Sequence, residues 1–235
     1  LPAAFVHDGL PIHFGPDGKL YASTGEATQR DRAQDLDFLG GKFLRMNPDG
    51  TVPEDNPFGD SLIWSIGHRN PQGFGFHPER DDLLISTEHG SSRGLDGAGG
   101  EDEINRILPG RNYGWPDVRG DETAEGIEEP LWQSGTEPIA PAGGTFCTGR
   151  RYPAWENAFL FVGLRGASLW VVKLSETEPI EVVSIERGLR DVLGRLRGIA
   201  EGPDGFLYLS TSNRDSRGTP APNDDRILRL VPVDG

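Results

Sequence analysis

A ten-residue pattern occurs twice in this 235-residue chain. Residues 15–24 read Gly-Pro-Asp-Gly-Lys-Leu-Tyr-Ala-Ser-Thr, and residues 202–211 read Gly-Pro-Asp-Gly-Phe-Leu-Tyr-Leu-Ser-Thr. Pro-Asp-Gly predicts a tight turn, because proline presets φ, aspartate bonds its own backbone and glycine supplies a positive φ. The apolar run after each turn predicts a short strand. A turn-and-strand unit that recurs along a chain is typical of a β-propeller.

Other segments support an all-β fold. Strand-like runs also occupy residues 76–87 and 157–164, whereas long helical periodicity is nearly absent. Apolar residues between Gly188 and Arg197 recur at helical spacing, but Gly194 interrupts them, so we expect a loop with at most one turn. The 33 glycines and 19 prolines are typical of a chain built from short strands and turns. We therefore predict one β-propeller domain over residues 1–235.

The length limits how much of a propeller this chain can form. At about 50 residues per blade, it supplies four or five blades. The repeats are irregularly spaced, so we expect insertions, the largest from Glu88 to about Gly144. An isolated arc would leave a sheet face uncovered, and the sequence opens at Leu1-Pro2 without an initiator methionine or a signal-like start. We expect the N-terminal blades to be missing from this sequence or supplied by a second polypeptide, with any export signal lost from view.

Charge and composition narrow the partners. The net charge is −14, and a surface this acidic repels phosphate backbones and anionic lipid. We therefore expect no nucleic-acid or membrane-surface partner, whereas neutral sugars and calcium remain compatible. No apolar run approaches the roughly 20 residues that span a bilayer. Cys147 is the single cysteine, which excludes an intrachain disulfide and predicts a small buried residue.

One short segment is unusual in its residue types. Ile66-Gly-His-Arg-Asn-Pro-Gln-Gly73 sets an arginine and an asparagine beside proline and glycine. This pattern suggests a rigid loop that presents a guanidinium and an amide. Taken alone, it is more typical of a solvated turn with a surface arginine.

A second segment combines carboxylates with glycines. It runs through Glu88-His-Gly90 and Glu101-Asp-Glu-Ile-Asn105 to Asn112-Tyr-Gly-Trp-Pro116. Hard cations such as Ca²⁺ take several oxygen ligands, both carboxylate and backbone carbonyl. The alternative is an acidic, solvated loop.

In combination and in this order, these segments resemble the soluble quinoprotein sugar dehydrogenases, the glucose/sorbosone dehydrogenase family, and especially its bacterial aldose sugar dehydrogenases. The matching pieces span nearly the whole chain: His7–Gly9, Phe14–Gly18, Gly41–Gly50, Gly67–Gly73, Asp102–Asn105, Asn112–Pro116, Arg195–Arg197 and Gly202–Gly205. The resemblance implies a six-bladed propeller that binds pyrroloquinoline quinone (PQQ) and calcium. It implies oxidation of an aldose at C1 to a lactone, an external electron acceptor, and a periplasmic or secreted location.

The resemblance also implies catalytic roles. His7 matches the general base that takes a proton from the C1 hydroxyl while hydride passes to the quinone, and the ordinary pKa of imidazole suits that task. Glu26 stands where the family usually has the aspartate that orients this histidine. Arg69 matches the arginine that stabilises negative charge developing on the quinone oxygen.

Four matches concern cofactor binding. Asn70 matches a cofactor contact, and Arg165 stands where the better-known glucose enzymes carry a lysine. Arg195 and Arg197 match two arginines that meet the carboxylates of the cofactor, with the forked geometry that suits carboxylates.

Four further matches concern metal binding. The carbonyls of Gly90 and Ser91 match the ligands of the cofactor-linked calcium, with serine in place of the more usual proline. Glu103 and the Tyr113 carbonyl match a second, structural calcium site. Trp115 fits a core or loop-anchoring aromatic better than a sugar platform.

Three functions remain open at this point. A quinoprotein aldose dehydrogenase is favoured by His7 with Arg69, because a binding module needs no base paired with an oxyanion stabiliser. The departures Glu26 and Arg165 favour a non-catalytic, calcium-stabilised propeller that binds sugar or protein. A calcium-dependent lactonase would centre on a carboxylate-rich calcium site without the arginines. Weaker candidates for the base are His13, His68, His77 and His89.

Overall fold

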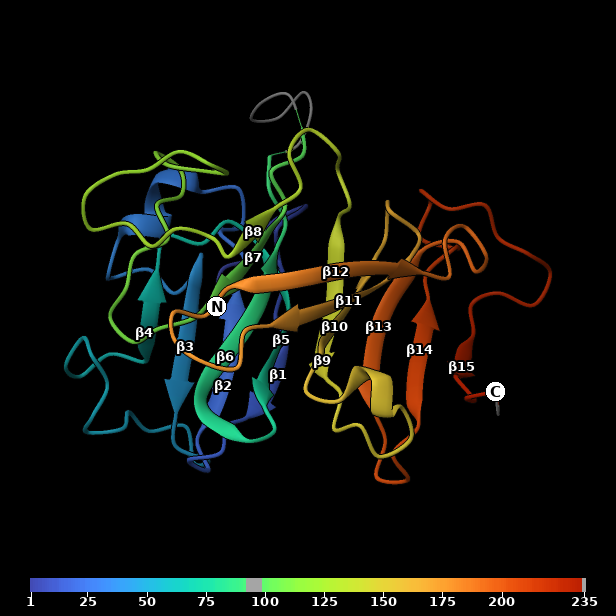
Figure 1. Ribbon diagram of the computed structural model, residues 1–235. Coiled ribbons are helices and arrows are strands. Elements are labelled where there is room, and N and C mark those ends of the chain that lie inside the picture. The colour runs from blue at the N-terminus through green and yellow to red at the C-terminus, as the bar shows by residue number, and fades with distance from the viewer. Residues whose placement is uncertain (92–98, 234–235) are drawn as a thin grey trace.

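The chain forms four antiparallel sheets, seen in a computed structural model that describes residues 1–91 and 99–233 (Figure 1). The first sheet holds β1 (Ile12–Phe14), β2 (Leu20–Thr24), β3 (Lys42–Met46) and β4 (Ile63–Ile66), and the second holds β5 (Pro71–His77), β6 (Arg80–Glu88), β7 (Glu103–Arg106) and β8 (Trp132–Gln133). The third holds β9 (Pro141–Phe146), β10 (Phe159–Gly163), β11 (Leu169–Leu174) and β12 (Val182–Gly188), and the fourth holds β13 (Leu196–Glu201), β14 (Leu207–Thr211) and β15 (Ile227–Arg229). The all-β prediction is confirmed.

Helical structure is confined to two short 3₁₀ segments in the described residues, η1 (Arg30–Gln34) and η2 (Pro153–Trp155). In the described part of the chain, neither segment is long and apolar enough to cross a membrane.

Both copies of the ten-residue pattern form the predicted turn and strand. In the first copy the amide of Gly18 donates to the carbonyl of Gly15 (3.0 Å), and in the second Gly205 donates to Gly202 (2.8 Å). Gly18 and Gly205 have φ of +72° and +78°, which side chains other than glycine rarely adopt. The strands that follow these turns are β2 and β14, each paired on both sides within its sheet.

Neighbouring sheets pack through their first strands. A Cβ added to Gly73 on β5 would lie 2.3 Å from the carbonyl oxygen of Ala142 on β9, so only glycine permits this approach. Further along, a Cβ on Gly75 would lie 3.3 Å from the amide of Phe146. The contacts advance in the same direction along both strands, so β5 and β9 point the same way.

The same arrangement continues from β9 to β13. A Cβ on Gly143 would lie 2.9 Å from the Cα of Gly198. Three residues after Gly198, the carboxylate of Glu201 accepts a hydrogen bond from the amide of Thr148 (2.7 Å). These contacts also advance together, so β13 points the same way as β9.

The first sheet follows the same rule. The amide of Gly9, just before β1, donates to the side chain of Asn70, just before β5 (3.2 Å). Farther along the two strands, the rings of His13 and Phe74 lie 4.7 Å apart. The N-terminal ends of β1, β5, β9 and β13 therefore lie at one end of the molecule, and the loops before them meet there.

Apolar cores fill the spaces between sheets. Phe43 and Phe74 meet between the first and second sheets, with ring centroids 5.3 Å apart, and both are fully buried. Leu160 and Leu207 belong to one cluster between the third and fourth sheets. Each fully buried side chain of this kind contributes about 1.5–3 kcal/mol relative to exposure.

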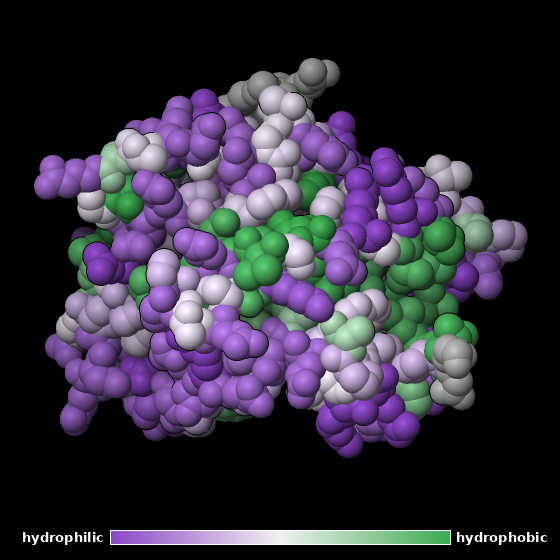
Figure 2. Space-filling model, in the orientation of Figure 1, coloured by the Kyte–Doolittle hydropathy of each residue, from purple (hydrophilic) through white to green (hydrophobic). Residues whose placement is uncertain are grey.

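The first and last sheets expose apolar side chains. Ile12 and Phe14 on β1 are exposed, as are Ile227 on β15 and Val231 beyond it. Figure 2 shows hydrophobic surface at the β14–β15 end of the molecule. Contiguous apolar surface of this kind marks a place where other structure packs.

One expectation is corrected and one is confirmed. The segment from Glu88 to about Gly144, expected to be a single insertion, contains β7, β8 and the start of β9 in its described part. Strand β7 escaped notice because its sequence, Glu-Ile-Asn-Arg, carries one apolar residue. The loop expected between Gly188 and Arg197 is present, and Leu196 already begins β13.

Lys42, the first residue of β3, is fully buried. Its ammonium donates to the carbonyls of Ala33 (2.7 Å), Gly40 (2.9 Å) and Arg32 (3.1 Å). Burial lowers the pKa of Lys42 to about 8, so the side chain is still mostly charged at pH 7. The lysine fastens the loop that carries η1 to the first sheet.

We predict that Lys42→Met lowers the free energy of unfolding by about 1–3 kcal/mol, because buried carbonyls lose their donor. Urea denaturation at pH 7 measures this change. The matched control is Lys173→Met, at an exposed position of β11, which should leave the midpoint unchanged. Equal midpoints for Lys42→Met and the wild type would contradict the assigned role.

Candidate functional site

His7 and Glu26 form a pair beside the N-terminal end of β1. Nδ1 of His7 contacts Oε1 of Glu26, and the two side chains are 10% and 0% exposed. The φ of His7 is +62°, a conformation that costs a non-glycine residue about 1–3 kcal/mol and clusters at functional sites. Because Nδ1 is engaged, Nε2 is the ring nitrogen that can exchange a proton with another molecule.

The backbone of Glu26 connects this pair to Arg69. The amide of Glu26 donates to the carbonyl of Arg69 (2.9 Å), and the amide of Ala27 donates to the carbonyl of His7 (3.1 Å). His7, Glu26 and Arg69 therefore form one hydrogen-bonded unit. Within the described residues, Oε2 of Glu26 is buried and lacks a hydrogen-bond partner, which is uncommon for a carboxylate oxygen.

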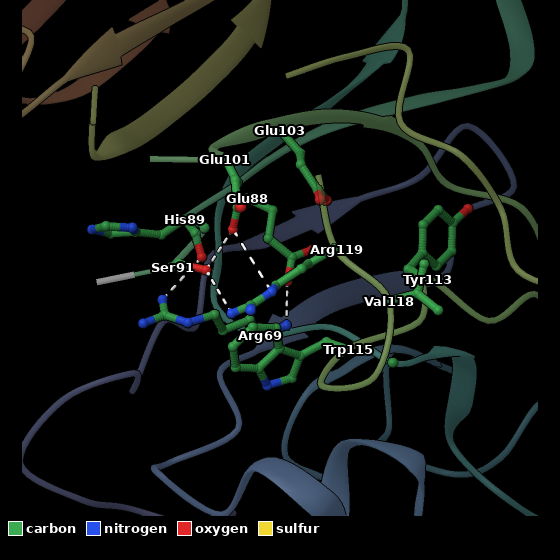
Figure 3. A pocket seen from close by; sticks show the side chains of 12 residues that line it. Arg69, Glu88, His89, Ser91, Glu101, Glu103, Tyr113, Trp115, Val118 and Arg119 are labelled. Atoms are coloured by element: carbon green, nitrogen blue, oxygen red, sulfur yellow. Dashed lines mark hydrogen bonds and ion pairs between the residues drawn. The ribbon is translucent and has the colours of Figure 1, made fainter. Parts of the chain in front are cut away.

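Arg69 is held rigidly although its side chain is long. It is 2% exposed, and its guanidinium lies 5.2 Å from the centroid of the Trp115 ring. Its Nη1 donates to the carbonyl of His89 (3.0 Å; Figure 3). A ring face and a carbonyl together fix the direction of the positive charge.

Asn70 ties the same loop to its neighbours. Its Oδ1 accepts hydrogen bonds from the amide of Gly9 (3.2 Å) and from Nε2 of Gln72 (3.0 Å). Its backbone carbonyl accepts from the amide of His89 (3.2 Å). The side-chain oxygen is thus committed to the protein, and the amide nitrogen is the group suited to a ligand.

A small cavity lies beside Arg69 (Figure 3). Its volume is about 20 Å³, close to the space that one water-sized guest needs. The lining residues are Gly67, Arg69, Glu88, His89, Gly90, Ser91, Glu101, Glu103, Tyr113, Trp115, Val118 and Arg119. All four residues expected at metal sites are among them.

Two carboxylates of this cavity oppose each other. Glu88 on β6 is the direct partner of Glu103 on β7. Burial, together with the negative charge of Glu88, raises the pKa of Glu103 to about 8. Like charges directly opposite destabilise a sheet, and a cation in the cavity would relieve the repulsion.

Gly90 and Ser91 shape another side of the cavity. The amide of Gly90 donates to Asp102 (2.9 Å), and a Cβ at Gly90 would lie 2.1 Å from the carbonyl oxygen of Glu101. The hydroxyl of Ser91 donates to Glu101 (2.6 Å) and accepts from Nη1 of Arg119 (3.3 Å). Arg119 therefore brings a positive charge that the sequence analysis did not include.

The donor set favours backbone ligands for a metal. Across residues 1–91 and 99–233, no three His, Cys, Asp or Glu side chains are grouped so that they could hold a metal ion. A cation in the cavity would have to take backbone carbonyl oxygens as well as a carboxylate, a mixture that Ca²⁺ accepts.

The three other arginines expected to bind the cofactor, Arg165, Arg195 and Arg197, lie around the start of β13. Nε and Nη2 of Arg195 donate to Asp215 (2.9 and 2.7 Å), and Nη1 donates to the carbonyl of Leu164 (3.1 Å). Arg197 lies 3.9 Å from Asp215 with its side chain 46% exposed. Arg165 follows Leu164 and is exposed. This group is separate from the cavity in its contacts, but it lies at the same end of the molecule.

The other histidines lie in different surroundings. His68 is fully buried, with Nε2 on Ser65 and Nδ1 on Glu88, so its ring cannot reach a substrate. His13 lies in the middle of β1, and His77 is the last residue of β5, at the end of that strand remote from His7. His89 lines the cavity edge, 3.1 Å from Asp102.

Comparison with known proteins identifies relatives. Residues 3–223 match the sequence model described as glucose/sorbosone dehydrogenase. The aldose sugar dehydrogenase YliI of Escherichia coli (strain K12) is 34% identical over 224 residues, which cover 87% of this chain and 57% of that protein. Quinoprotein glucose dehydrogenase B of Acinetobacter calcoaceticus is 34% identical over 142 residues, which cover 51% of this chain and 28% of that protein.

A solved structure is also similar. The PQQ-bound form of aldose sugar dehydrogenase from Streptomyces coelicolor is 38% identical, with a TM-score of 0.84 over 97% of this chain and 63% of that one. The chain therefore spans less than two thirds of each of these three relatives.

The pair of Arg195 and Asp215 predicts a pH dependence. Burial alone would raise the pKa of Asp215, but hydrogen bonds from Arg195 and from the amide of Arg217 outweigh burial and hold it below 3.8. A carboxyl group with a depressed pKa stabilises the fold at pH values above its pKa in the unfolded chain. This stabilisation is lost as the pH falls through its pKa in the folded protein.

We expect Asp215→Asn to lower the free energy of unfolding by about 1 kcal/mol at pH 7, because the partly exposed pair loses its charge. The difference from the wild type should shrink as the pH falls below 3.8. Urea titrations at pH 7, 5, 4 and 3 measure it, with exposed Asp60→Asn as the control. A difference that grows toward acid pH would refute the pairing.

Proposed function

The chain belongs to the glucose/sorbosone dehydrogenase family, and we propose that it acts as a PQQ-dependent aldose dehydrogenase. The proposed reaction oxidises C1 of an aldose to the lactone, and the electrons then leave to an external acceptor. We further propose a periplasmic or secreted location, in keeping with the family resemblance.

One observation carries the proposal: a histidine–carboxylate pair is hydrogen-bonded through the backbone to a buried arginine. Removing hydride from a sugar carbon requires a base for the hydroxyl proton and a positive charge where negative charge develops. His7 with Glu26 meets the first requirement and Arg69 the second. The glutamate that replaces the usual aspartate still reaches His7.

Each of these three residues has a defined task. His7 accepts the C1 hydroxyl proton at Nε2, because Nδ1 is engaged by Glu26. The carboxylate of Glu26 orients the ring and stabilises the imidazolium that forms. Arg69 holds a fixed charge in a site shielded from water, where such a charge acts most strongly. PQQ, when bound, supplies the hydride acceptor.

The arginines near β13 suit the binding of a planar tricarboxylate such as PQQ. Arg195 and Arg197 present forked donors, Arg165 adds a third, and Asn70 offers its amide nitrogen. Asp215 already engages Arg195, so a bound carboxylate would share that guanidinium. Asn70, Arg165 and Arg195 come from loops at this end of the molecule, and Arg197 is the second residue of β13.

The charges of the cavity suit calcium, and its lining includes the candidate ligands of both proposed sites. We propose that the carbonyls of Gly90 and Ser91 bind a cofactor-linked Ca²⁺, and that Glu103 and the Tyr113 carbonyl bind a second. The opposed side chains of Glu88 and Glu103 support a cation here, because bound Ca²⁺ would stabilise the ionised form of Glu103, whose pKa is raised by burial and by the charge of Glu88.

The complete fold is proposed to be a six-bladed propeller, to which residues 1–235 contribute one partial domain of four sheets. The support is that the chain covers 63% of the Streptomyces coelicolor structure. Exposed apolar residues on β1 and β15 offer faces for the further blades.

We predict that His7→Gln slows sugar-driven reduction of bound quinone by about 10² or more, because the base is lost. Affinity for the quinone should stay unchanged. Stopped-flow absorbance of calcium- and PQQ-loaded protein after adding an aldose measures the rate. The control is His77→Gln, remote from the site, which should react like the wild type. Wild-type rates in His7→Gln would overturn the assignment.

We predict that calcium stabilises the protein and retains the quinone. Saturation at 100 times the dissociation constant would add about 2.7 kcal/mol, so chelation should lower the melting temperature and release PQQ. Glu103→Gln should reduce this calcium-dependent gain, whereas Glu122→Gln, on an exposed part of the neighbouring loop, should keep it. Melting curves indifferent to chelator would count against both calcium sites.

A further inference from the structure

The carboxylate of Glu88 is buried and accepts hydrogen bonds from three groups. Oε1 accepts from the backbone amides of Arg69 and Asn70, the latter at 3.1 Å. Oε2 accepts from Nδ1 of His68 at 2.9 Å. Both oxygens of Glu88 are thus engaged by protein donors.

His68 is enclosed and holds Glu88 in turn. Its Nε2 lies 2.8 Å from the hydroxyl of Ser65, and its ring stacks on Tyr113 with centroids 4.5 Å apart. An ionised carboxylate only accepts hydrogen bonds, so Nδ1 of His68 must carry a proton. Nε2 is then the acceptor for the hydroxyl proton of Ser65.

We propose that Glu88, oriented by His68 and Ser65, is the positioning residue for Arg69 and Asn70. The proposal rests on the proposed function for the roles of those two residues. Glu88 lines the cavity, but its proposed task is to position these two residues and not to bind a metal.

The geometry shows why one carboxylate can position both residues. Two successive amides that converge on one oxygen fix the orientation of both peptide planes, and charge assistance strengthens each bond. The carbonyl of Arg69 is held from the other side by the amide of Glu26. Loss of Glu88 would free the peptide that aims the guanidinium, while the contact of Arg69 with Trp115 would remain.

The first test determines which ring nitrogen of His68 carries the proton, by ¹⁵N NMR of the metal- and cofactor-free protein. In the wild type Nδ1 should be protonated. In Glu88→Gln the amide group keeps its oxygen toward the backbone amides and turns its NH₂ toward His68, so Nδ1 should lose its proton and Nε2 should gain one. An unprotonated Nδ1 in the wild type, or no reversal in the variant, overturns the relay.

The second test measures amide hydrogen exchange at Arg69 and Asn70. Glu88→Ala should speed both by about tenfold, the size expected when a charge-assisted hydrogen bond is lost. The matched control is Glu101→Ala, an acid of the same cavity bonded to Ser91, which should leave both amides unchanged. Unchanged exchange in Glu88→Ala overturns the positioning role, and if that variant does not fold, the tautomer reversal in Glu88→Gln decides.

The third test asks whether positioning reaches the reaction. In quinone-loaded protein, Glu88→Ala should slow reduction by about tenfold or more at saturating quinone, and Glu88→Gln should restore most of the rate because its oxygen still accepts both amides. Equal rates in Glu88→Ala and the wild type overturn the link to Arg69. A wild type whose bound quinone is never reduced by any aldose refutes the proposed function instead, and the tautomer and hydrogen-exchange tests then still decide the positioning.

Discussion

Close contact between the first strands of neighbouring sheets determines the geometry of this molecule. Gly73 and Gly143 bring backbone against backbone, and a side chain at either position would force the strands apart. The strands point the same way, so every loop that precedes a first strand reaches one end of the molecule. Residues as far apart in sequence as His7 and Arg195 are thereby placed at a common end, which is where propellers bind ligands.

Within that end, two buried acids hold one peptide from opposite sides. The amide of Glu26 donates to the carbonyl of Arg69, and the side chain of Glu88 accepts from the amide of Asn70 in the same peptide group and from the amide of Arg69. Glu26 also contacts His7, and Glu88 faces Glu103 across two strands. A continuous series of contacts therefore connects the base, the guanidinium and the cavity. Burying a carboxylate is costly without donors. Both oxygens of Glu88 have them, whereas Glu26 has His7 at Oε1 and no hydrogen-bond partner at Oε2 within the described residues.

The sequence allowed correct predictions where neighbouring residues determine the local structure by themselves. Pro-Asp-Gly predicted its turns, and the glucose/sorbosone dehydrogenase resemblance pointed to the contact of His7 with Glu26, which the structure contains. Strand β7 was missed because Ile104 is its one apolar residue, so no apolar alternation is visible. Glu88, the partner of Arg69, and Asp215, the partner of Arg195, could not be predicted. Their positions depend on how strands and loops align with one another, and this register cannot be read from a single sequence.

The central hypothesis is that residues gathered at one end of the molecule form a quinone site beside the two proposed calcium sites. A crystal structure of the chain with PQQ and Ca²⁺ tests it most directly. The quinone carboxylates should lie on Arg195 and Arg197, the reactive carbonyls between His7 and Arg69, and a calcium ion on the carbonyls of Gly90 and Ser91. Quinone or calcium bound away from these residues would contradict it.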